Sequence, residues 1–119
     1  MQYNNKQVRR QDRLLEQAKA LELLEIGEYG VLSLALAEDG PYGIPLNYVW
    51  DKKNAIYFHC ANDGRKLETL KQNNKASFCV VGKTNVVPIK FSTGYESIVL
   101  SGTLFMNLPL KKEPVRLTY

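Results

Sequence analysis

Apolar residues recur with a helical period near the start of this 119-residue chain. The stretch RLLEQAKALELLEI, residues 13–26, places apolar residues at the i, i+4 and i+7 spacing of an amphipathic helix, and two more widen the stripe: Leu14, Ala18 and Leu21, with Leu24 and Ile26. Asp12 is suited to cap its start, and Gly27 is suited to the left-handed position that ends many helices. We therefore expect a helix over 13–26 that packs one face against the rest of the protein.

From Tyr29 onward the pattern becomes that of β-strands separated by turn residues. The expected strands are residues 29–37, 42–50, 55–61, 75–82 and 95–108. The turns at 38–41 and 51–54 are short, so the first three strands should form an antiparallel meander. Pro45 lacks a backbone donor and should lie at a strand edge or a bulge. Gly102 is expected at a bulge or bend, and residues 83–94 are expected to form a loop.

A second helix is expected between the third and fourth strands, from Gly64 to Gln72, with Asp63 as its N-cap. The expected fold is therefore mainly β, a small antiparallel barrel with an N-terminal helix and one helix between strands 3 and 4. Its length suits a single domain over residues 1–119. Neither G-x-G-x-x-G nor G-x-x-x-x-G-K occurs, which argues against the common nucleotide-binding folds.

Composition narrows the function classes. Hydrophobic residues make up 45% and charged residues 24%, and no apolar run is long enough for a membrane span or a signal peptide. We expect a cytoplasmic protein without a membrane partner. The net charge is +4, but the basic residues are dispersed and the aromatic residues form only a weak stripe, so nucleic acid is not the expected partner. One histidine and the separated Cys60 and Cys79 make no metal site.

The segment IYFHCANDGRKLETL, residues 56–70, holds the candidate chemistry. The only histidine, His59, ends the third strand, and Arg65 and Lys66 open the helix that follows. Cations are electrostatically unfavourable at a helix N-terminus, unless a dianionic phosphate is bound there by backbone donors and both side chains. The electrostatic argument alone leaves a second interpretation open, in which Arg65 and Lys66 lie on a solvated surface. His59 could likewise be a structural histidine.

Four motifs occur in one order and resemble a known family: RRQDR, DGPYGIPLNYVW, IYFHCANDGRKLETLKQNN and YESIVLSGT. Over about residues 9–107 the chain resembles the FMN-binding split-barrel flavoproteins related to pyridoxamine 5'-phosphate oxidase. Within them it is most similar to the nitroimidazole-resistance (Nim-type) branch. The resemblance implies a split β-barrel, FMN as the cofactor, and a homodimer with FMN at the subunit interface.

The resemblance also implies roles for individual residues. Arg65 and Lys66 match the pair that binds the FMN phosphate. The segment of the second strand that lies along the isoalloxazine ring, partly through backbone groups, is matched by Leu46, Asn47 and Tyr48. Phe58 and His59 match the strand end beside the flavin. In Nim-type members the matching histidine faces the substrate side of the ring, so His59 is the candidate catalytic residue.

Two departures from the family qualify this interpretation. The C-terminal substrate motif of the vitamin-phosphate oxidases is not found, so that reaction is not expected. The chain is also shorter at its C-terminal end than Nim-type proteins, so we expect a barrel with one open edge.

The resemblance and these departures leave two candidate functions. The first is an FMN-dependent reductase that takes hydride from NADH or NADPH and reduces a small electron-poor acceptor such as a nitroaromatic. The alternative is a non-catalytic flavin-binding module or an inactive shortened member.

Overall fold

The computed structural model describes residues 6, 9, 11–36, 40–58, 74–87, 89, 92–106 and 115–118. A short 3-10 turn, η1 (Gln11–Arg13), precedes a single described α-helix, α1 (Gln17–Ile26). Six strands follow, and they fill most of the remaining described chain: β1 (Tyr29–Leu36), β2 (Gly40–Trp50), β3 (Ala55–Phe58), β4 (Lys75–Val87), β5 (Ser92–Met106) and β6 (Val115–Thr118).

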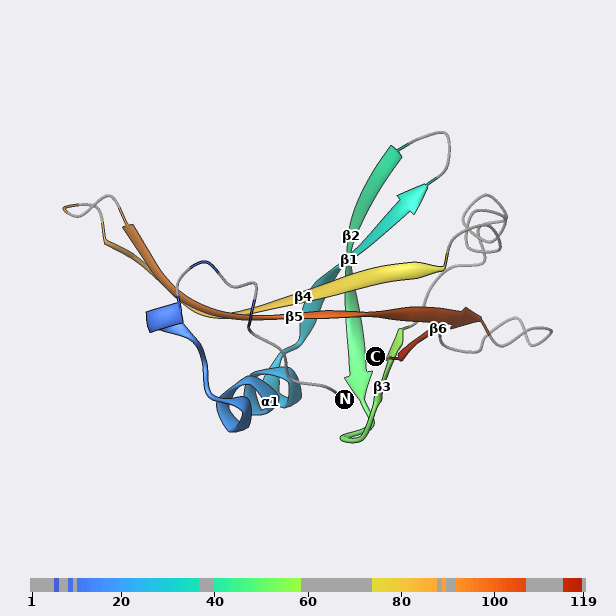
Figure 1. The fold of residues 1–119 in the computed structure, drawn as a ribbon, viewed down its shortest axis with the longest axis horizontal. Coiled ribbons are helices and arrows are strands. Elements are labelled where there is room, and N and C mark those ends of the chain that lie inside the picture. Colours follow the sequence, from blue (N-terminus) through green and yellow to red (C-terminus); the bar gives the residue numbers. More distant parts are fainter. Residues whose placement is uncertain are drawn as a thin grey trace.

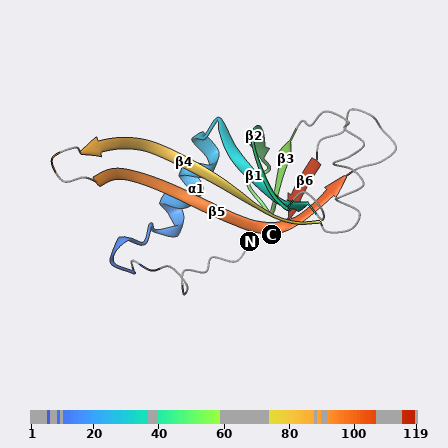
Figure 2. The ribbon, with the colours of Figure 1, turned by 90° about the horizontal axis from the view of Figure 1, so that it is seen from above.

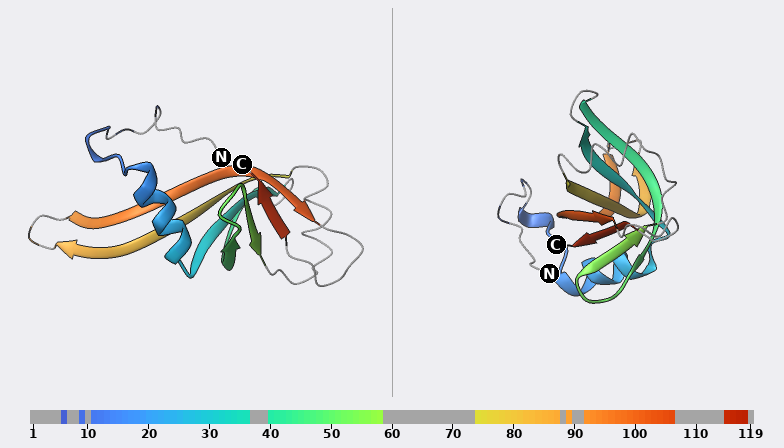
Figure 3. Two further views of the ribbon diagram at one scale, coloured as in Figure 1. Left: turned by 90° about the horizontal axis from the view of Figure 1, so that it is seen from below. Right: turned by 90° about the vertical axis from the view of Figure 1, so that its right-hand side faces the viewer.

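The strands form a closed antiparallel barrel in the order β1-β2-β3-β6-β5-β4 (Figure 1). The first three strands are the expected meander, because β1 pairs with β2 and β2 pairs with β3. Gly40 has a φ of 77°, the left-handed conformation that glycine tolerates, at the start of β2. The end-on view in Figure 3 shows the strands curling round a common interior. The fold is thus mainly β and consistent with a split barrel, as the sequence predicts.

The last strand corrects the expectation of an open edge. Residues 115–118 form β6, which pairs with β3 on one side and with β5 on the other. Ile56 of β3 lies opposite Leu117, and Leu117 lies opposite Leu104 of β5. This short segment therefore closes the barrel by giving β3 and β5 each a second neighbour.

Strands β4 and β5 are longer than expected and correct a second prediction. Residues 83–94, expected as a loop, largely continue the two strands, with β4 ending at Val87 and β5 beginning at Ser92. The register shifts between Val81 and Thr84, whereas Gly102 pairs regularly with Ala76. The irregularity lies in the middle of β4 and not at Gly102. Beyond it the two strands extend past the rest of the barrel as a hairpin arm (Figures 1 and 2).

Helix α1 packs against β4, β5 and β2, and of the expected stripe only Leu24 is fully buried. Its buried residues are Ala20, Leu23 and Leu24, while Leu14 remains 37% exposed. The helix starts after Glu16, which makes no side-chain cap, so Asp12 does not cap it. The apolar residues of this helix lie on several sides, and contact with the barrel selects which of them are covered.

Gly27 ends α1 for a different reason from the one predicted. Its φ is −64°, so the left-handed conformation is not used. A β-carbon there would lie 2.4 Å from Tyr48 Oη, 2.8 Å from Val80 Cγ1 and 3.2 Å from the Leu23 carbonyl oxygen. Only glycine allows the helix end to approach β2 and β4 this closely. The core beneath it is apolar throughout, with Phe58 and Phe78 at its centre and no buried charged residue among the described residues.

Candidate functional site

Strands β2 and β3 bring two of the predicted site segments together. Tyr48 of β2 pairs with Phe58, which is the last residue of β3. Leu46 and Asn47 immediately precede Tyr48 on the same strand. All four residues therefore meet where β3 ends, opposite the C-terminal part of β2.

The other predicted site residues lie outside the described residues. The same holds for the helix expected over residues 64–72 and its N-cap. His59 follows Phe58 directly in the sequence, so the segment that carries the candidate chemistry leaves β3 beside Tyr48. The places of three residues in the site therefore stay predictions: His59, Arg65 and Lys66.

The turn between β2 and β3 fixes their pairing. One carboxylate oxygen of Asp51, Oδ1, accepts backbone N–H bonds from Lys53 at 2.8 Å, and from Asn54 and Ala55 at 3.1 Å each. Desolvation by itself would raise the pKa of Asp51, but these three donors and the charge of Lys53 lower it overall. The turn thus sets the register in which Tyr48 meets Phe58.

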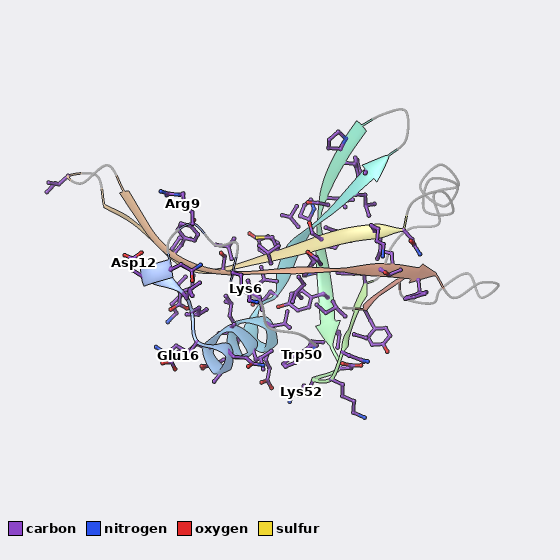
Figure 4. The ribbon with its side chains drawn as sticks, in the orientation of Figure 1. Lys6, Arg9, Asp12, Glu16, Trp50 and Lys52 are labelled. Carbon is purple, nitrogen blue, oxygen red and sulfur yellow. The ribbon has the colours of Figure 1, made fainter. Side chains whose placement is uncertain are left out.

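A surface ion pair also ties this turn to helix α1. Lys52 has a φ of 63°, and its Nζ lies 2.7 Å from Glu25 Oε1. Both side chains are largely exposed, so the pair contributes little to stability. Figure 4 shows Lys52 at this turn, with Trp50 at the adjoining end of β2.

Side chains along β2 alternate between the core and the solvent. Leu46, Tyr48 and Trp50 are half-buried and pack against the core, whereas Asn47 is exposed. Phe58 is 0% exposed, and its ring lies 4.9 Å from that of Phe78. Of the four described site residues, only Asn47 therefore presents its side chain outward, and the other three can reach a ligand only through backbone groups or by rearrangement.

Tyr48 is held firmly in place by the helix. Its hydroxyl donates a 2.5 Å hydrogen bond to the carbonyl oxygen of Leu24, and its ring packs edge-on against Phe78 at 5.1 Å. Burial raises the pKa of Tyr48 to about 12, so the phenol stays protonated at neutral pH. These contacts position β2 against α1.

Two prolines show which backbone groups of β2 point away from β1. Pro41 pairs with Ala35 and Pro45 pairs with Val31, without a break in register. Because proline has no N–H, this pairing is regular only if the backbone groups of both prolines point away from β1. Backbone groups of alternate residues point the same way, so those of Gly43 and Asn47 do too.

Among the described residues, this edge of β2 is without a partner strand from Gly40 to Asn47, in line with the edge or bulge expected at Pro45. β3 pairs only with Tyr48, Val49 and Trp50, so no described strand covers the edge from Gly40 to Asn47. The edge offers N–H donors at Gly43 and Asn47 and carbonyl acceptors, with no donor at either proline. The side-chain amide of Asn47 is itself fixed, because its Nδ2 donates to the carbonyl oxygen of Glu28 at 3.0 Å. Sequence reasoning singled out Pro45 but missed Pro41; the even spacing of the two prolines was the available signal.

The edge suits a flat heterocycle better than a metal ion. Alternating N–H and C=O groups can bond the donors and acceptors on the rim of a planar ring, while the core packing below keeps the strand rigid. Among the described residues, no group of three or more His, Cys, Asp or Glu side chains could hold a metal.

In the described part of the chain, no helix is long and apolar enough to cross a membrane.

Comparison with known proteins identifies the family. The family model of pyridoxamine 5'-phosphate oxidase matches residues 16–106, which is most of the chain. This chain belongs to the pyridoxamine 5'-phosphate oxidase family. The family match covers α1 and strands β1 to β5, and so includes the described corner formed by Tyr48 and Phe58.

A solved structure shares the fold of this pyridoxamine 5'-phosphate oxidase family member. It is the crystal structure of a candidate 5-nitroimidazole antibiotic resistance protein from Bacteroides thetaiotaomicron. The TM-score is 0.66 at 18% sequence identity, over 81% of this chain and 58% of the other, so the chain spans little more than half the length of that protein. No curated protein matches the chain.

Proposed function

We propose that this member of the pyridoxamine 5'-phosphate oxidase family binds FMN and acts as a flavin-dependent reductase of small electron-poor acceptors. The observation that carries the proposal is the open β2 edge, which ends where Tyr48 meets Phe58. It lies within the part of the chain that the family model matches. The structural neighbour named for 5-nitroimidazole resistance supports the choice of a nitro compound as the acceptor to test.

The described residues fit an isoalloxazine ring. The backbone N–H of Asn47, with the neighbouring carbonyl groups of this edge, is suited to the acceptors and N–H on the pyrimidine-like rim of the ring. Leu46, Tyr48 and Phe58 would support that edge from below, since all three pack into the core. Arg65 and Lys66 would hold the FMN phosphate, through charge-assisted hydrogen bonds that contribute about 1.5–3 kcal/mol each.

When bound, FMN supplies hydride acceptance from NADH or NADPH and electron transfer to the acceptor. The chain's own groups would then bind the flavin and orient the acceptor. The β2 backbone donors would stabilise negative charge on the ring rim, and His59 would position the acceptor or give a proton to the product. An unperturbed imidazole pKa near 6.5 is suited to both tasks.

The first test is the flavin itself. We expect the purified protein to be yellow, to release FMN on denaturation, to bleach with NADH or NADPH, and to regain colour with a nitroaromatic compound. FMN binding without turnover on any acceptor would select the non-catalytic flavin-binding module instead. A protein that binds no FMN after reconstitution would refute both.

A further inference from the structure

The edge of β2 that faces away from β1 is long and regular. Eight residues, from Gly40 to Asn47, pair with β1 in unbroken register, and no described strand pairs with their other side. In Figure 1, β3 follows only the lower part of β2, and β1 is the described strand that accompanies the upper part. An edge of this kind offers backbone N–H and C=O groups to any extended chain that meets it.

Three common ways of protecting such an edge are missing in this stretch. The segment GPYGIPLN, residues 40–47, contains no charged side chain. Its register with β1 contains no bulge. The strand is not short either, since β2 spans 11 residues. Charged residues, bulges and short strands are the usual means by which proteins keep an edge from pairing, so another feature of β2 must do this.

The turn between β2 and β3 shows independently which residues point their backbone groups to this side. The N–H of Asp51 donates to the carbonyl oxygen of Ala55 at 3.1 Å, on the β3 side of the strand. Because the direction of the backbone groups alternates along an extended chain, those of the odd-numbered residues of β2 point to the same side. Pro41 and Pro45 are both odd-numbered, in agreement with their regular pairing with β1.

The two prolines remove half of the donors that this edge would otherwise have. Gly43 and Asn47 keep an N–H, and they lie four residues apart, or about 13 Å along the strand. A peptide strand laid along the edge would find carbonyl acceptors throughout. Its own carbonyl groups opposite both prolines would have no donor, which is costly for backbone groups removed from water. A compact ligand that needs a single donor would lose nothing.

We infer that Pro41 and Pro45 together keep β2 from accepting a peptide strand, so that this edge stays available to a compact ligand. Their even spacing is essential, because it places both on the outward side with the single donor of Gly43 between them. A proline at an even-numbered position would instead remove a hydrogen bond to β1. This protection does not require flavin, and it goes beyond the proposed function by stating which kind of partner the edge excludes.

Restoring the missing donors gives the first test. The double variant Pro41→Thr/Pro45→Thr has an N–H at both positions and polar side chains that suit a strand. We expect it to associate through β2, with a mass in sedimentation velocity at least double that of the wild type at the same micromolar concentration. The matched control is Gly43→Thr, which adds the same side chain without adding a donor, at a position where a β-carbon has room.

Two results would overturn the inference in this experiment. The first is a double variant with the mass of the wild type. The second is a control, Gly43→Thr, that gains as much mass as the double variant, because the side chain and not the donor would then cause association.

A second measurement uses the wild type alone and does not depend on a variant that folds. In amide hydrogen exchange followed by NMR, the protection factor of the Gly43 N–H should be at least tenfold lower than that of Ile44, whose N–H points to β1. The Gly43 value should not rise with protein concentration. Protection of Gly43 equal to that of Ile44, or growing with concentration, would mean that a strand pairs with this edge. Exchange is measured again after FMN is added, and a lack of response to FMN would count against the proposed function alone.

Discussion

The hydroxyl of Tyr48 donates a hydrogen bond to the carbonyl oxygen of Leu24 and so joins strand β2 to helix α1. Its neighbour in sequence, Asn47, points the other way and is exposed. One residue therefore anchors the strand to the helix, while the next presents groups at the open edge. The stability of the anchor and the binding properties of the edge can be tested separately.

Removal of the Tyr48 hydroxyl should destabilise the protein without disturbing the ring packing. In Tyr48→Phe the edge-on contact with Phe78 remains, but the buried Leu24 carbonyl loses the hydrogen bond from the Tyr48 hydroxyl. We expect the free energy of unfolding, measured by denaturant titration, to fall by about 1–3 kcal/mol. Tyr95→Phe, at a 63% exposed tyrosine, is the control and should change it by less than about 0.5 kcal/mol. Equal effects in both variants would contradict the anchoring role.

Alkaline pH should reveal the same anchor. The pKa of Tyr48 is raised to about 12 in the folded state, against about 10 in an unfolded chain. Between these values the unfolded state loses its phenolic proton and the folded state keeps it, so the free energy of unfolding falls as pH rises above about 10. Tyr48→Phe should show a shallower decline between pH 10 and pH 12 than the wild type. Parallel curves for the two proteins would contradict the raised pKa.

Gly27 should not accept even the smallest side chain. A methyl group there would press on Tyr48 Oη and Val80 Cγ1, although the backbone angle itself suits any residue. We expect Gly27→Ala to lower the free energy of unfolding by about 1–3 kcal/mol, through displacement of α1 from the barrel. Gly43→Ala is the matched control, since its nearest neighbour would be Val31 Cγ1 at 3.6 Å. The prediction fails if thermal unfolding shows Gly27→Ala to be as stable as Gly43→Ala.

The phosphate assignment depends on Arg65. If its guanidinium binds the FMN phosphate, Arg65→Ala should weaken FMN binding by about 1.5–3 kcal/mol, or roughly ten- to 150-fold. Fluorescence titration of the apoprotein measures this directly. His59→Ala is the comparison variant, and it should keep FMN bound while its turnover with NADH and a nitroaromatic changes. An unchanged dissociation constant in Arg65→Ala would instead support the second interpretation, in which Arg65 is a solvated surface residue.

Much of the β architecture follows from the sequence alone, because strand alternation and turn residues act over short distances. Alternation along β4 puts Ala76, Phe78 and Val80 on one face of the strand, and in the structure that face packs into the core. The β1–β2 hairpin and the turn at Asp51 are likewise encoded by the residues within them. Pro45 predicted an edge or a bulge, and it lies in regular register at an edge that no described strand covers, since a missing N–H is a local property.

The tertiary structure decided what depends on distant neighbours. The buried face of α1 is formed by Ala20, Leu23 and Leu24 because the barrel selects one side of a helix that is apolar on several. The four residues of β6 carry little strand signal, and they pair because β3 and β5 lie on either side of them. Gly27 looked like a helix terminator, yet it is a point of close approach to Tyr48 and Val80. Local propensity therefore determines most strands of this chain. Contacts between residues far apart in sequence determine the closure of the barrel, the buried face of α1 and the hydrogen bond from Tyr48 to Leu24.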